Sequence, residues 1–431
     1  MSSVNFDVQE HKVPTAHIRE YARATQDQND VLHLAVKQYS PRERFVAQNE
    51  ITVIGAHANG FPKVELYEPL WDELYNSLKA KGIQISNIFI ADVAHQGASS
   101  HLNEELLGND PSWMDHPRDL FLMVNHFRHL MKRPIVGFGH SMGGNNLVNL
   151  SLMHPRLFTT LILMDPVIQR WPNPKANFAP AKASARRRDR WPSRKVAAES
   201  FKKSKFYQTW DPRVLENWIQ YGLRDLPTAI HPETQSSSDV EVTLSTTKHQ
   251  EVMSFLRGNF PTAEHPFPSF DPDRLAQPDI DMNTFPRNAP FVRSEPHSTF
   301  QKLPFLRPSV FYIFGEHSDM SDTHLQADKL SMTGVGVGGS GGKIKGRVDA
   351  VTMKGVGHLI PMENVNGTAD AAAGWIAPEI DLWRRHEDIE RRKWAEVPKE
   401  KRSLMPEEYV KTMNADWSKI LADEQTRWSK L

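Results

Sequence analysis

Cysteine, long apolar runs and an excess of charge of either sign are all missing from this chain. Its 431 residues include 52 basic and 52 acidic side chains and 19 histidines, but no cysteine. The missing thiols exclude disulfides, thiolate metal sites and a cysteine nucleophile. The balanced charge gives no indication of a nucleic-acid partner or of binding to an anionic membrane. Any catalysis therefore has to rely on oxygen and nitrogen groups.

The sequence also lacks the features of membrane insertion and secretion. It holds no run of about 18 apolar residues, the length that suggests a membrane-spanning helix. The opening residues, MSSVNFDVQEHK, do not have the charged and then apolar layout of a secretory signal peptide. We therefore expect a soluble protein with no stable membrane insertion.

The strongest positive signal is the stretch PIVGFGHSMGGNNLVNL at residues 134–150. An apolar run leads into the pentapeptide GHSMG around Ser141, and apolar residues at helical spacing follow at once. This is the pattern of a strand, a sharp turn and a helix that exposes a serine hydroxyl. The glycines two before and two after the serine are needed because a Cβ there would collide with its neighbours. Ser141 is the predicted nucleophile, and the N–H of Met142 is a predicted oxyanion donor.

Strands and helices alternate on either side of this stretch. Alternation of this kind predicts a mostly parallel central sheet with helices on both faces. A hairpin at residues 13–21 and 31–39 is expected at one edge of this sheet. The carboxyl ends of parallel strands share one rim, so His57, Ser141 and Asp165 are expected there together. The predicted central strands are residues 51–56, 85–91, 135–138, 160–164, 310–315 and 348–353.

The alternation breaks in a polar, Trp- and Pro-rich stretch, which we interpret as a cap inserted over that rim. Helical segments are expected in it at residues 195–206, 212–223 and 245–256. Its apolar side chains, Trp171 and Trp218 among them, are candidates for contact with an acyl chain. A basic cluster that contains Arg186, Arg187 and Arg188 is a candidate for binding an anionic head group. The predicted division is a core at 1–167 and 308–395, a cap at 168–307 and a helical tail at 396–431.

A serine hydroxyl needs a base within hydrogen-bond reach. His358 is the predicted base because it follows the last predicted strand on a glycine-flanked loop. The orienting acid is left open between two strand ends. Asp165 ends the strand after the elbow helix, whereas Asp319 follows the strand at 310–315. The more common position for such an acid is occupied by Ser318, one residue before Asp319, so Asp165 is favoured.

A tetrahedral intermediate needs a second N–H donor for its oxyanion. The loop at residues 57–60 follows a buried strand and carries a glycine that permits close approach. We expect the second donor to be the backbone N–H of Asn59 or of Ala58.

With its serine elbow, strand-end acid and late histidine in that order, the chain resembles the α/β-hydrolase family. The resemblance covers about residues 31–168 and 308–375. It extends to a fungal peroxisomal branch that includes a yeast peroxisomal lipase and hydrolases of toxin biosynthesis. It implies an esterase, lipase or thioesterase that needs neither a metal nor an organic cofactor.

The last three residues, Ser429, Lys430 and Leu431, form the tripeptide that the peroxisomal import receptor reads. We therefore expect a location in the peroxisome matrix. The predicted function is hydrolysis of a small-molecule acyl ester or thioester, fatty-acid-like or from secondary metabolism, through an acyl-enzyme. Two alternatives stay open: acyl transfer in toxin or secondary-metabolite biosynthesis, and non-catalytic binding on the same fold.

Overall fold

The chain forms two compact units in the computed structural model, Met1–Ile380 and Asp381–Leu431. The first holds every predicted site residue outside the terminal tripeptide. The second contains the end of α12, then η5 (Lys399–Lys401) and α13 (Glu407–Met413). The structure describes residues 3–60, 64–172, 174–234, 239–260, 279–281, 283–285, 289–415, 417 and 421.

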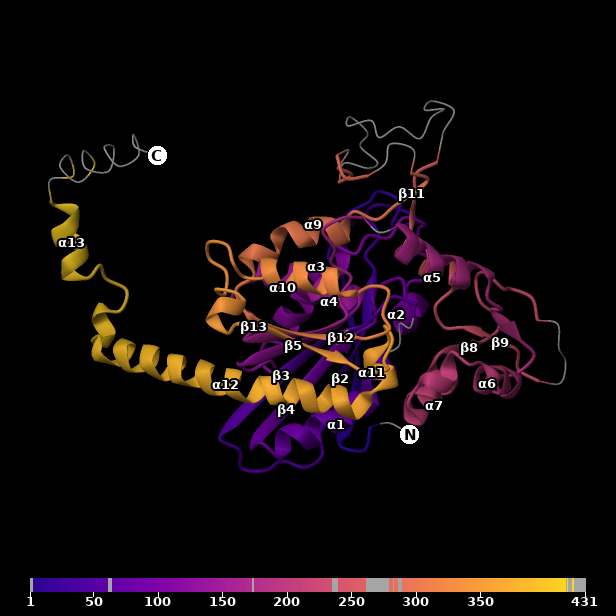
Figure 1. Ribbon diagram of the computed structural model, residues 1–431, viewed down its shortest axis with the longest axis horizontal. Helices are drawn as coiled ribbons and strands as arrows, with labels where there is room; N and C mark the ends of the chain where they lie inside the picture. The colour runs from indigo at the N-terminus through magenta and orange to yellow at the C-terminus, as the bar shows by residue number, and fades with distance from the viewer. Residues whose placement is uncertain are drawn as a thin grey trace. The chain divides into compact units, whose positions relative to one another are not determined.

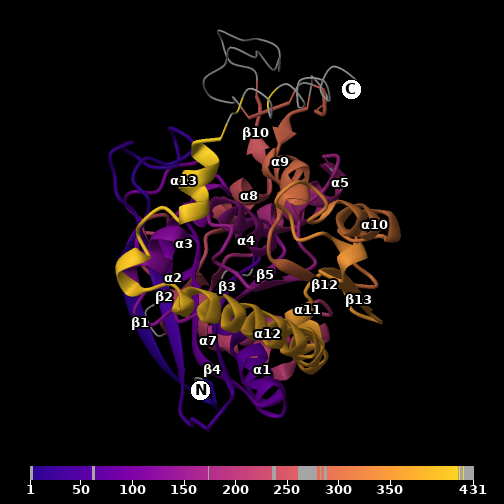
Figure 2. The same ribbon diagram turned by 90° about the vertical axis from the view of Figure 1, so that its left-hand side faces the viewer.

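An eight-stranded sheet forms the centre of the first unit, in the order β1-β2-β4-β3-β5-β6-β12-β13. Strand β2 pairs antiparallel with both of its neighbours, and the other pairings are parallel. Figure 2 shows β1 and β2 at one edge of the sheet and β12 and β13 at the other. The strands are β1 (Phe6–Pro14), β2 (His33–Pro41), β3 (Asn49–Ala56), β4 (Ile83–Ala91), β5 (Ile135–His140), β6 (Thr160–Met164), β12 (Ser309–Gly315) and β13 (Val348–Met353).

Each face of the sheet carries its own apolar core, because successive residues of a strand point to opposite sides. Val53 faces one core, which α1 and the first half of α12 cover, and Ile54 faces the other, beneath α3, α4 and α9. In Figure 1 the sheet lies between these two groups of helices. The helices are α1 (Glu68–Lys79), α2 (Gly97–Leu102), α3 (Asp115–His126), α4 (Met142–Met153), α9 (Glu295–Lys302), α10 (Thr323–Met332), α11 (Ile360–Glu363) and α12 (Val365–Glu396).

The edge hairpin was expected at 13–21 and 31–39, and its first half is wrong. An antiparallel pair does lie at the sheet edge, but its first strand is β1 (Phe6–Pro14). In β1 only Phe6 and Val13 are buried, so the strand shows little of the apolar alternation that marks a half-buried strand. The residues that follow Pro14 form bends and turns instead, among which Ile18 has a φ of 61°.

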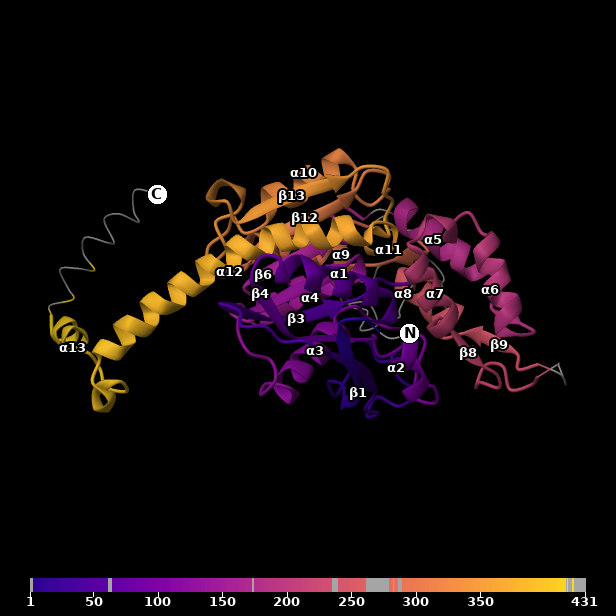
Figure 3. The same ribbon diagram turned by 90° about the horizontal axis from the view of Figure 1, so that it is seen from below.

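Between β6 and β12 the chain leaves the sheet, and its described residues form further helices and two small sheets. Three of the helices match the predicted segments within a few residues. Figures 1 and 3 show α5, α6, α7, β8 and β9 together beyond one end of the central sheet. The elements are α5 (Pro174–Arg186), β7 (Arg190–Trp191), α6 (Arg194–Lys203), η2 (Tyr207–Thr209), α7 (Pro212–Tyr221), β8 (Leu223–Asp225), β9 (Val242–Leu244), α8 (Lys248–Phe255), β10 (Arg257–Gly258) and β11 (Phe291–Val292).

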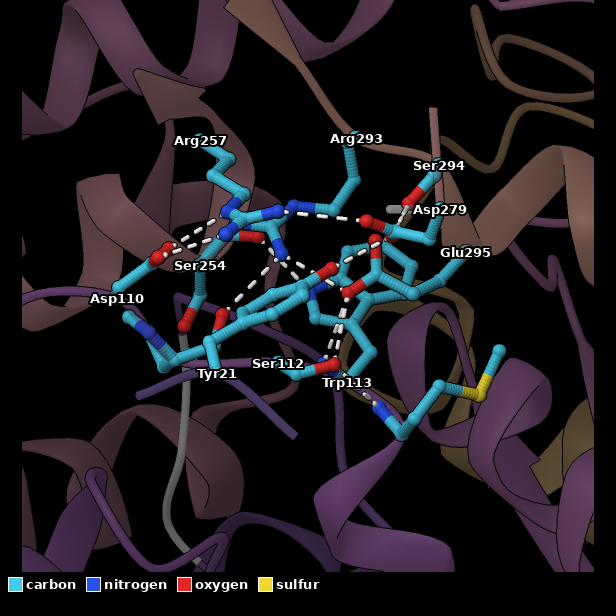
Figure 4. Close-up of polar contacts among 12 residues, drawn as sticks. Tyr21, Asp110, Ser112, Trp113, Ser254, Arg257, Asp279, Arg293, Ser294 and Glu295 are labelled. Atoms are coloured by element: carbon cyan, nitrogen blue, oxygen red, sulfur yellow. Dashed lines mark hydrogen bonds and ion pairs between the residues drawn. The ribbon is translucent and has the colours of Figure 1, made fainter. Parts of the chain in front are cut away.

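A buried polar cluster joins the return of this segment to the core (Figure 4). The guanidinium of Arg293 lies 3.0 Å from Glu295 Oε1, and both side chains are almost completely buried. The same carboxylate oxygen accepts the N–H of Trp113 at 3.0 Å. Arg257 forms two 2.8 Å hydrogen bonds to Asp110. These pairs connect β10, β11 and α9 to the loop before α3.

Among the described residues, no helix combines the length and the apolar character that crossing a membrane requires.

Removing the Glu295 carboxylate will leave the Arg293 charge buried without its partner. We expect Glu295→Ala to lower the free energy of unfolding by about 3–5 kcal/mol, as for other broken buried pairs. Urea denaturation measures this change. Glu43→Ala is the control, because Glu43 and Lys79 form an exposed pair at 3.4 Å and such pairs contribute about 0–1 kcal/mol. Equal losses in the two variants would contradict the prediction.

Candidate active site

Ser141 occupies a sharp turn between β5 and α4. Its backbone has φ 55° and ψ −116°, in the left-handed half of the map that L-residues rarely adopt. Gly143 makes this turn possible, because a Cβ there would lie 2.0 Å from the carbonyl oxygen of Ala56 on the adjacent strand β3. The Ser141 N–H is held by the Met164 carbonyl at 2.9 Å. The turn therefore presents a hydroxyl at the carboxyl end of the central strands.

Three predicted side chains meet at this end of the sheet. His358 Nε2 lies 2.9 Å from Ser141 Oγ, and His358 Nδ1 lies 2.6 Å from Asp165 Oδ2. Asp165 and Ser141 are buried, whereas the His358 side chain is 28% exposed. The three residues come from different strand ends separated by 24 to 217 positions in the chain. The arrangement can deprotonate the serine and keep the resulting imidazolium beside a carboxylate.

Of the two acid candidates, the structure brings Asp165 to His358. Asp165 follows β6 with a φ of 43°, and its own N–H bonds to the Ile313 carbonyl at 2.8 Å. Ser318 donates its hydroxyl to Asp165 Oδ2 and accepts the Met320 N–H at 3.1 Å. Asp319 is exposed. The serine at position 318 thus supports the acid on the neighbouring strand.

The loop that carries His358 is fixed by one carboxylate. Glu363 accepts the N–H of Gly357 at 2.7 Å and the N–H of Leu359 at 3.2 Å. These are the two backbone amides on either side of His358. The first turn of α11 therefore restrains the imidazole from both sides.

Two backbone amides are available for an oxyanion. Met142 N–H begins α4, and helix-start amides have no partner within the helix. In the part of the chain that the structure describes, neither Met142 nor Asn59 has an acceptor for its backbone N–H. The N–H of Ala58, the other candidate, donates to Tyr67 Oη at 3.0 Å. The geometry therefore favours Asn59 over Ala58 as the second donor.

The inserted segment contacts the loop at residues 57–60, which carries the candidate amides of Ala58 and Asn59. The side-chain amide of Asn59 donates to the Glu251 carbonyl on α8 at 3.2 Å. The buried Glu251 carboxylate in turn binds Ser184 and Arg187 near the end of α5. It also lies close to Gly60, where an added Cβ would be 3.2 Å from Glu251 Oε1. Helices α5 and α8 are thus part of the support of the loop.

Two buried histidines border the site. Burial lowers the pKa of His57 to about 4 and the pKa of His140 to about 3, with a further contribution from His358 for the second. His57 Nε2 accepts the Val93 N–H at 2.9 Å, so its proton resides on Nδ1, which donates to the Ala58 carbonyl. Both histidines are neutral near pH 7 and serve as hydrogen-bonding groups.

The predicted substrate contacts are dispersed over the inserted segment. Trp171 is exposed and stacks on His297. Trp218 is buried against Phe201, Tyr207 and Trp210, inside the aromatic core of that segment.

The arginine cluster has different surroundings at each of its three positions. Arg187 pairs with Glu251, whereas Arg186 and Arg188 are exposed. The Arg188 guanidinium lies over the Trp191 ring and donates to the Arg190 carbonyl at 2.7 Å. The terminal residues Ser429, Lys430 and Leu431 lie outside the described residues.

Four hydrogen-bonding neighbours of the site were not predicted from the sequence: Tyr67, His140, Ser318 and Glu363. The signal for Glu363 was a carboxylate at a helix start five residues after the candidate base. Tyr67 and Ser318 reach the site through contacts across the fold, for which the sequence carries no local pattern. Across the described residues, no group of three His, Asp or Glu side chains is arranged to hold a metal ion.

Comparison with known proteins gives both a family match and full-length relatives. The family described as serine aminopeptidase, S33 matches residues 70–221. The type I acyl-CoA thioesterase mpaH of Penicillium roqueforti is 41% identical, over 98% of this chain and 96% of that protein. The abhydrolase domain-containing protein ACTT2-2 of Alternaria alternata is 27% identical, over 66% of this chain and 99% of that protein.

A solved structure matches along the whole chain. The peroxisomal α/β-hydrolase Lpx1 of Saccharomyces cerevisiae superimposes with a TM-score of 0.65, over 99% of both chains and with 16% identity. At that identity the likeness concerns the fold alone.

The lowered pKa of His57 makes stability depend on pH. The unfolded side chain binds a proton at about pH 6.5 and the folded one at about pH 4, so unfolding takes up a proton between these values. This contribution is fully present above pH 6.5 and is lost as the pH falls towards 4. Between pH 4 and 6.5 the free energy of unfolding of the parent rises with pH. We expect this slope to be smaller in the His57→Gln variant by up to about 1.4 kcal/mol per pH unit. Urea unfolding of both proteins at a series of pH values measures it, and parallel curves would contradict the prediction.

Proposed function

The chain belongs to the α/β-hydrolase family, and we propose that it is a serine thioesterase that cleaves an acyl-CoA type of substrate. The observation that carries the proposal is the pair of hydrogen bonds that join Ser141 Oγ to His358 Nε2 and His358 Nδ1 to Asp165. The relative mpaH, a type I acyl-CoA thioesterase at 41% identity, supports a thioester substrate. The predicted fold and the predicted family resemblance are both confirmed by these comparisons.

The proposed reaction begins when His358 Nε2 takes the proton of Ser141 as Oγ attacks the thioester carbonyl. The carbonyl oxygen becomes an oxyanion and receives the N–H groups of Met142 and Asn59. As the intermediate collapses, the C–S bond breaks and His358 returns its proton to the departing thiolate. Water then attacks the acyl-enzyme with the same base, the carboxylic acid leaves and Ser141 regains its proton. Asp165 orients the imidazole throughout and stabilises its positive charge.

Acyl transfer would follow the same first half-reaction with a hydroxyl or amine in place of water. The site's geometry supports the shared acyl-enzyme and leaves the acceptor to experiment. A non-catalytic binding protein would need Ser141 and His358 too far apart for proton transfer. Their separation of 2.9 Å argues against that alternative.

For the substrate, the proposal places the acyl part beneath the inserted segment and the charged end of CoA near its surface. Arg186 and Arg188 are exposed and are the candidates for contact with phosphate, because Arg187 is paired with Glu251. Trp171, exposed beside His297, is the candidate for an apolar contact. The acid itself, fatty-acid-like or from secondary metabolism, is proposed at the level of its class alone.

The proposed location is the peroxisome matrix. The support is the terminal tripeptide Ser429-Lys430-Leu431, which fits the import receptor.

The catalytic proposal is tested by following acyl-CoA hydrolysis, together with labelling of the serine by a fluorophosphonate probe. We expect Ser141→Ala to lose the adduct and Asp165→Asn to lower kcat by about 10⁴, because the histidine tautomer is no longer fixed. Asp319→Asn is the matched control and should stay within about twofold of the parent, since exposed substitutions away from the site have small effects. Full activity in Asp165→Asn would overturn the assignment of the acid.

The head-group contact is tested with the double variant Arg186→Ser and Arg188→Ser. Each surface cation near a phosphate contributes about 0.5–1 kcal/mol. We therefore expect the KM for an acyl-CoA to rise by roughly 5- to 30-fold, with no change for a small neutral ester. An equal effect on both substrates would remove the arginines from the proposed site.

A further inference from the structure

We propose that Tyr67 and His140 are positioning residues that fix the loop at residues 57–60 (the oxyanion loop) and the loop of His358 relative to each other. The inference rests on the proposed function, because it concerns the same site. Neither side chain is the nucleophile, the base or the acid. Both lie on a continuous path of hydrogen bonds from Ala58 to His358.

Three hydrogen bonds form this path. Ala58 N–H donates to Tyr67 Oη at 3.0 Å. Tyr67 Oη and His140 Nδ1 are 2.9 Å apart, and His140 Nε2 lies 3.0 Å from the His358 carbonyl oxygen. The path thus links the end of β3 to the loop after β13 through the residue that directly precedes the nucleophile.

The direction of each bond is set by the two ends of the path. The His358 carbonyl is an acceptor, so His140 Nε2 carries the proton. A neutral imidazole then has an unprotonated Nδ1, which accepts the Tyr67 hydroxyl proton. The Ala58 N–H is a donor, and the oxygen of Tyr67 accepts it. With these directions, each donor and each acceptor along the path has a partner.

Because the path is completely buried, each of its polar groups needs a hydrogen-bond partner within the protein. Ala58, Tyr67 and His140 are each at most 1% exposed. A buried polar group without a partner costs about 1–3 kcal/mol, and water cannot replace a lost bond without a cavity to hold it. Burial also lowers the pKa of His140 to about 3, which keeps it in the neutral form that the path needs.

The path acts on two groups that meet the transition state. By accepting the Ala58 N–H, Tyr67 fixes the His57–Ala58 peptide plane, one peptide before the amide of Asn59, the proposed second oxyanion donor. By holding the His358 carbonyl, His140 fixes the backbone from which the imidazole projects. The ring centroids of His140 and His358 lie 5.6 Å apart. Loosening either group weakens interactions that strengthen as charge develops, and changes ground-state binding much less.

The first test is Tyr67→Phe, which keeps the ring packed on Trp71 and removes the oxygen alone. We expect kcat for acyl-CoA hydrolysis and the rate of Ser141 labelling to fall about 10- to 100-fold, with KM within about twofold. The matched control is Tyr312→Phe. Tyr312 is also fully buried and bonds to Thr333 Oγ1 at 2.7 Å, between β12 and the end of α10. We expect it to lower the melting temperature by a similar amount and to keep the parental kcat.

The second test separates the two links at His140. His140→Gln keeps an N–H near the place of Nε2 and therefore the bond to the His358 carbonyl. His140→Asn keeps an acceptor near the place of Nδ1 and therefore the bond to Tyr67. We expect each variant to retain more activity than His140→Ala. Adding Tyr67→Phe should lower kcat further in His140→Asn and much less in His140→Gln, where that link is already broken.

The outcomes distinguish this inference from the proposed function. If the parent enzyme neither reacts with the probe nor hydrolyses a thioester, the proposed function fails. If the parent is active and Tyr67→Phe keeps the kcat of Tyr312→Phe, the positioning role alone is overturned. The His140 variants decide the matter even if Tyr67→Phe does not fold.

Discussion

The left-handed backbone at Ser141 is the constraint on which the site depends. A residue held there costs of order 1–3 kcal/mol and persists because its surroundings leave no alternative. Strand β5 enters the turn in full register with β3 and β6, and α4 leaves it with Gly143 pressed against the Ala56 carbonyl. The packing of the sheet and helix thus offsets this cost and keeps the hydroxyl directed towards His358. Asp165, His358 and the loop at residues 57–60 then surround this constrained turn.

Much of the central sheet could be predicted because its strands are buried on both faces. Residues 348–353 were predicted to the residue, and the apolar stretch at 51–56 lies within β3. The edge strand β1 was placed too late since its exposed residues carry no alternation. Helix α9 was not among the helices predicted in the Pro-rich part of the cap, although its one proline, Pro296, stands in the first turn, where proline is well tolerated.

The same distinction applies to the site. Ser141 and His358 were predictable because a turn motif and a strand end are local features. The sheet order does not choose between Asp165 and Asp319, because the ends of β6 and β12 both lie between β5 and β13. The choice depends on side-chain direction, since Asp165 bonds to His358 whereas Asp319 is exposed. Tyr67 and Ser318 are brought in from η1 (Val64–Tyr67) and from the turn after β12 by tertiary packing. No spacing rule connects such residues to a serine in another part of the chain.

The contact between Asn59 and Glu251 has a consequence for how such enzymes diversify. Glu251, Arg187 and Ser184 belong to the inserted segment, yet they support the loop at residues 57–60, which carries the proposed second oxyanion donor. A change that reshapes the segment for a new acid therefore also acts on this loop. We therefore expect a substitution near the end of α5 or in α8 that changes substrate range to change turnover as well.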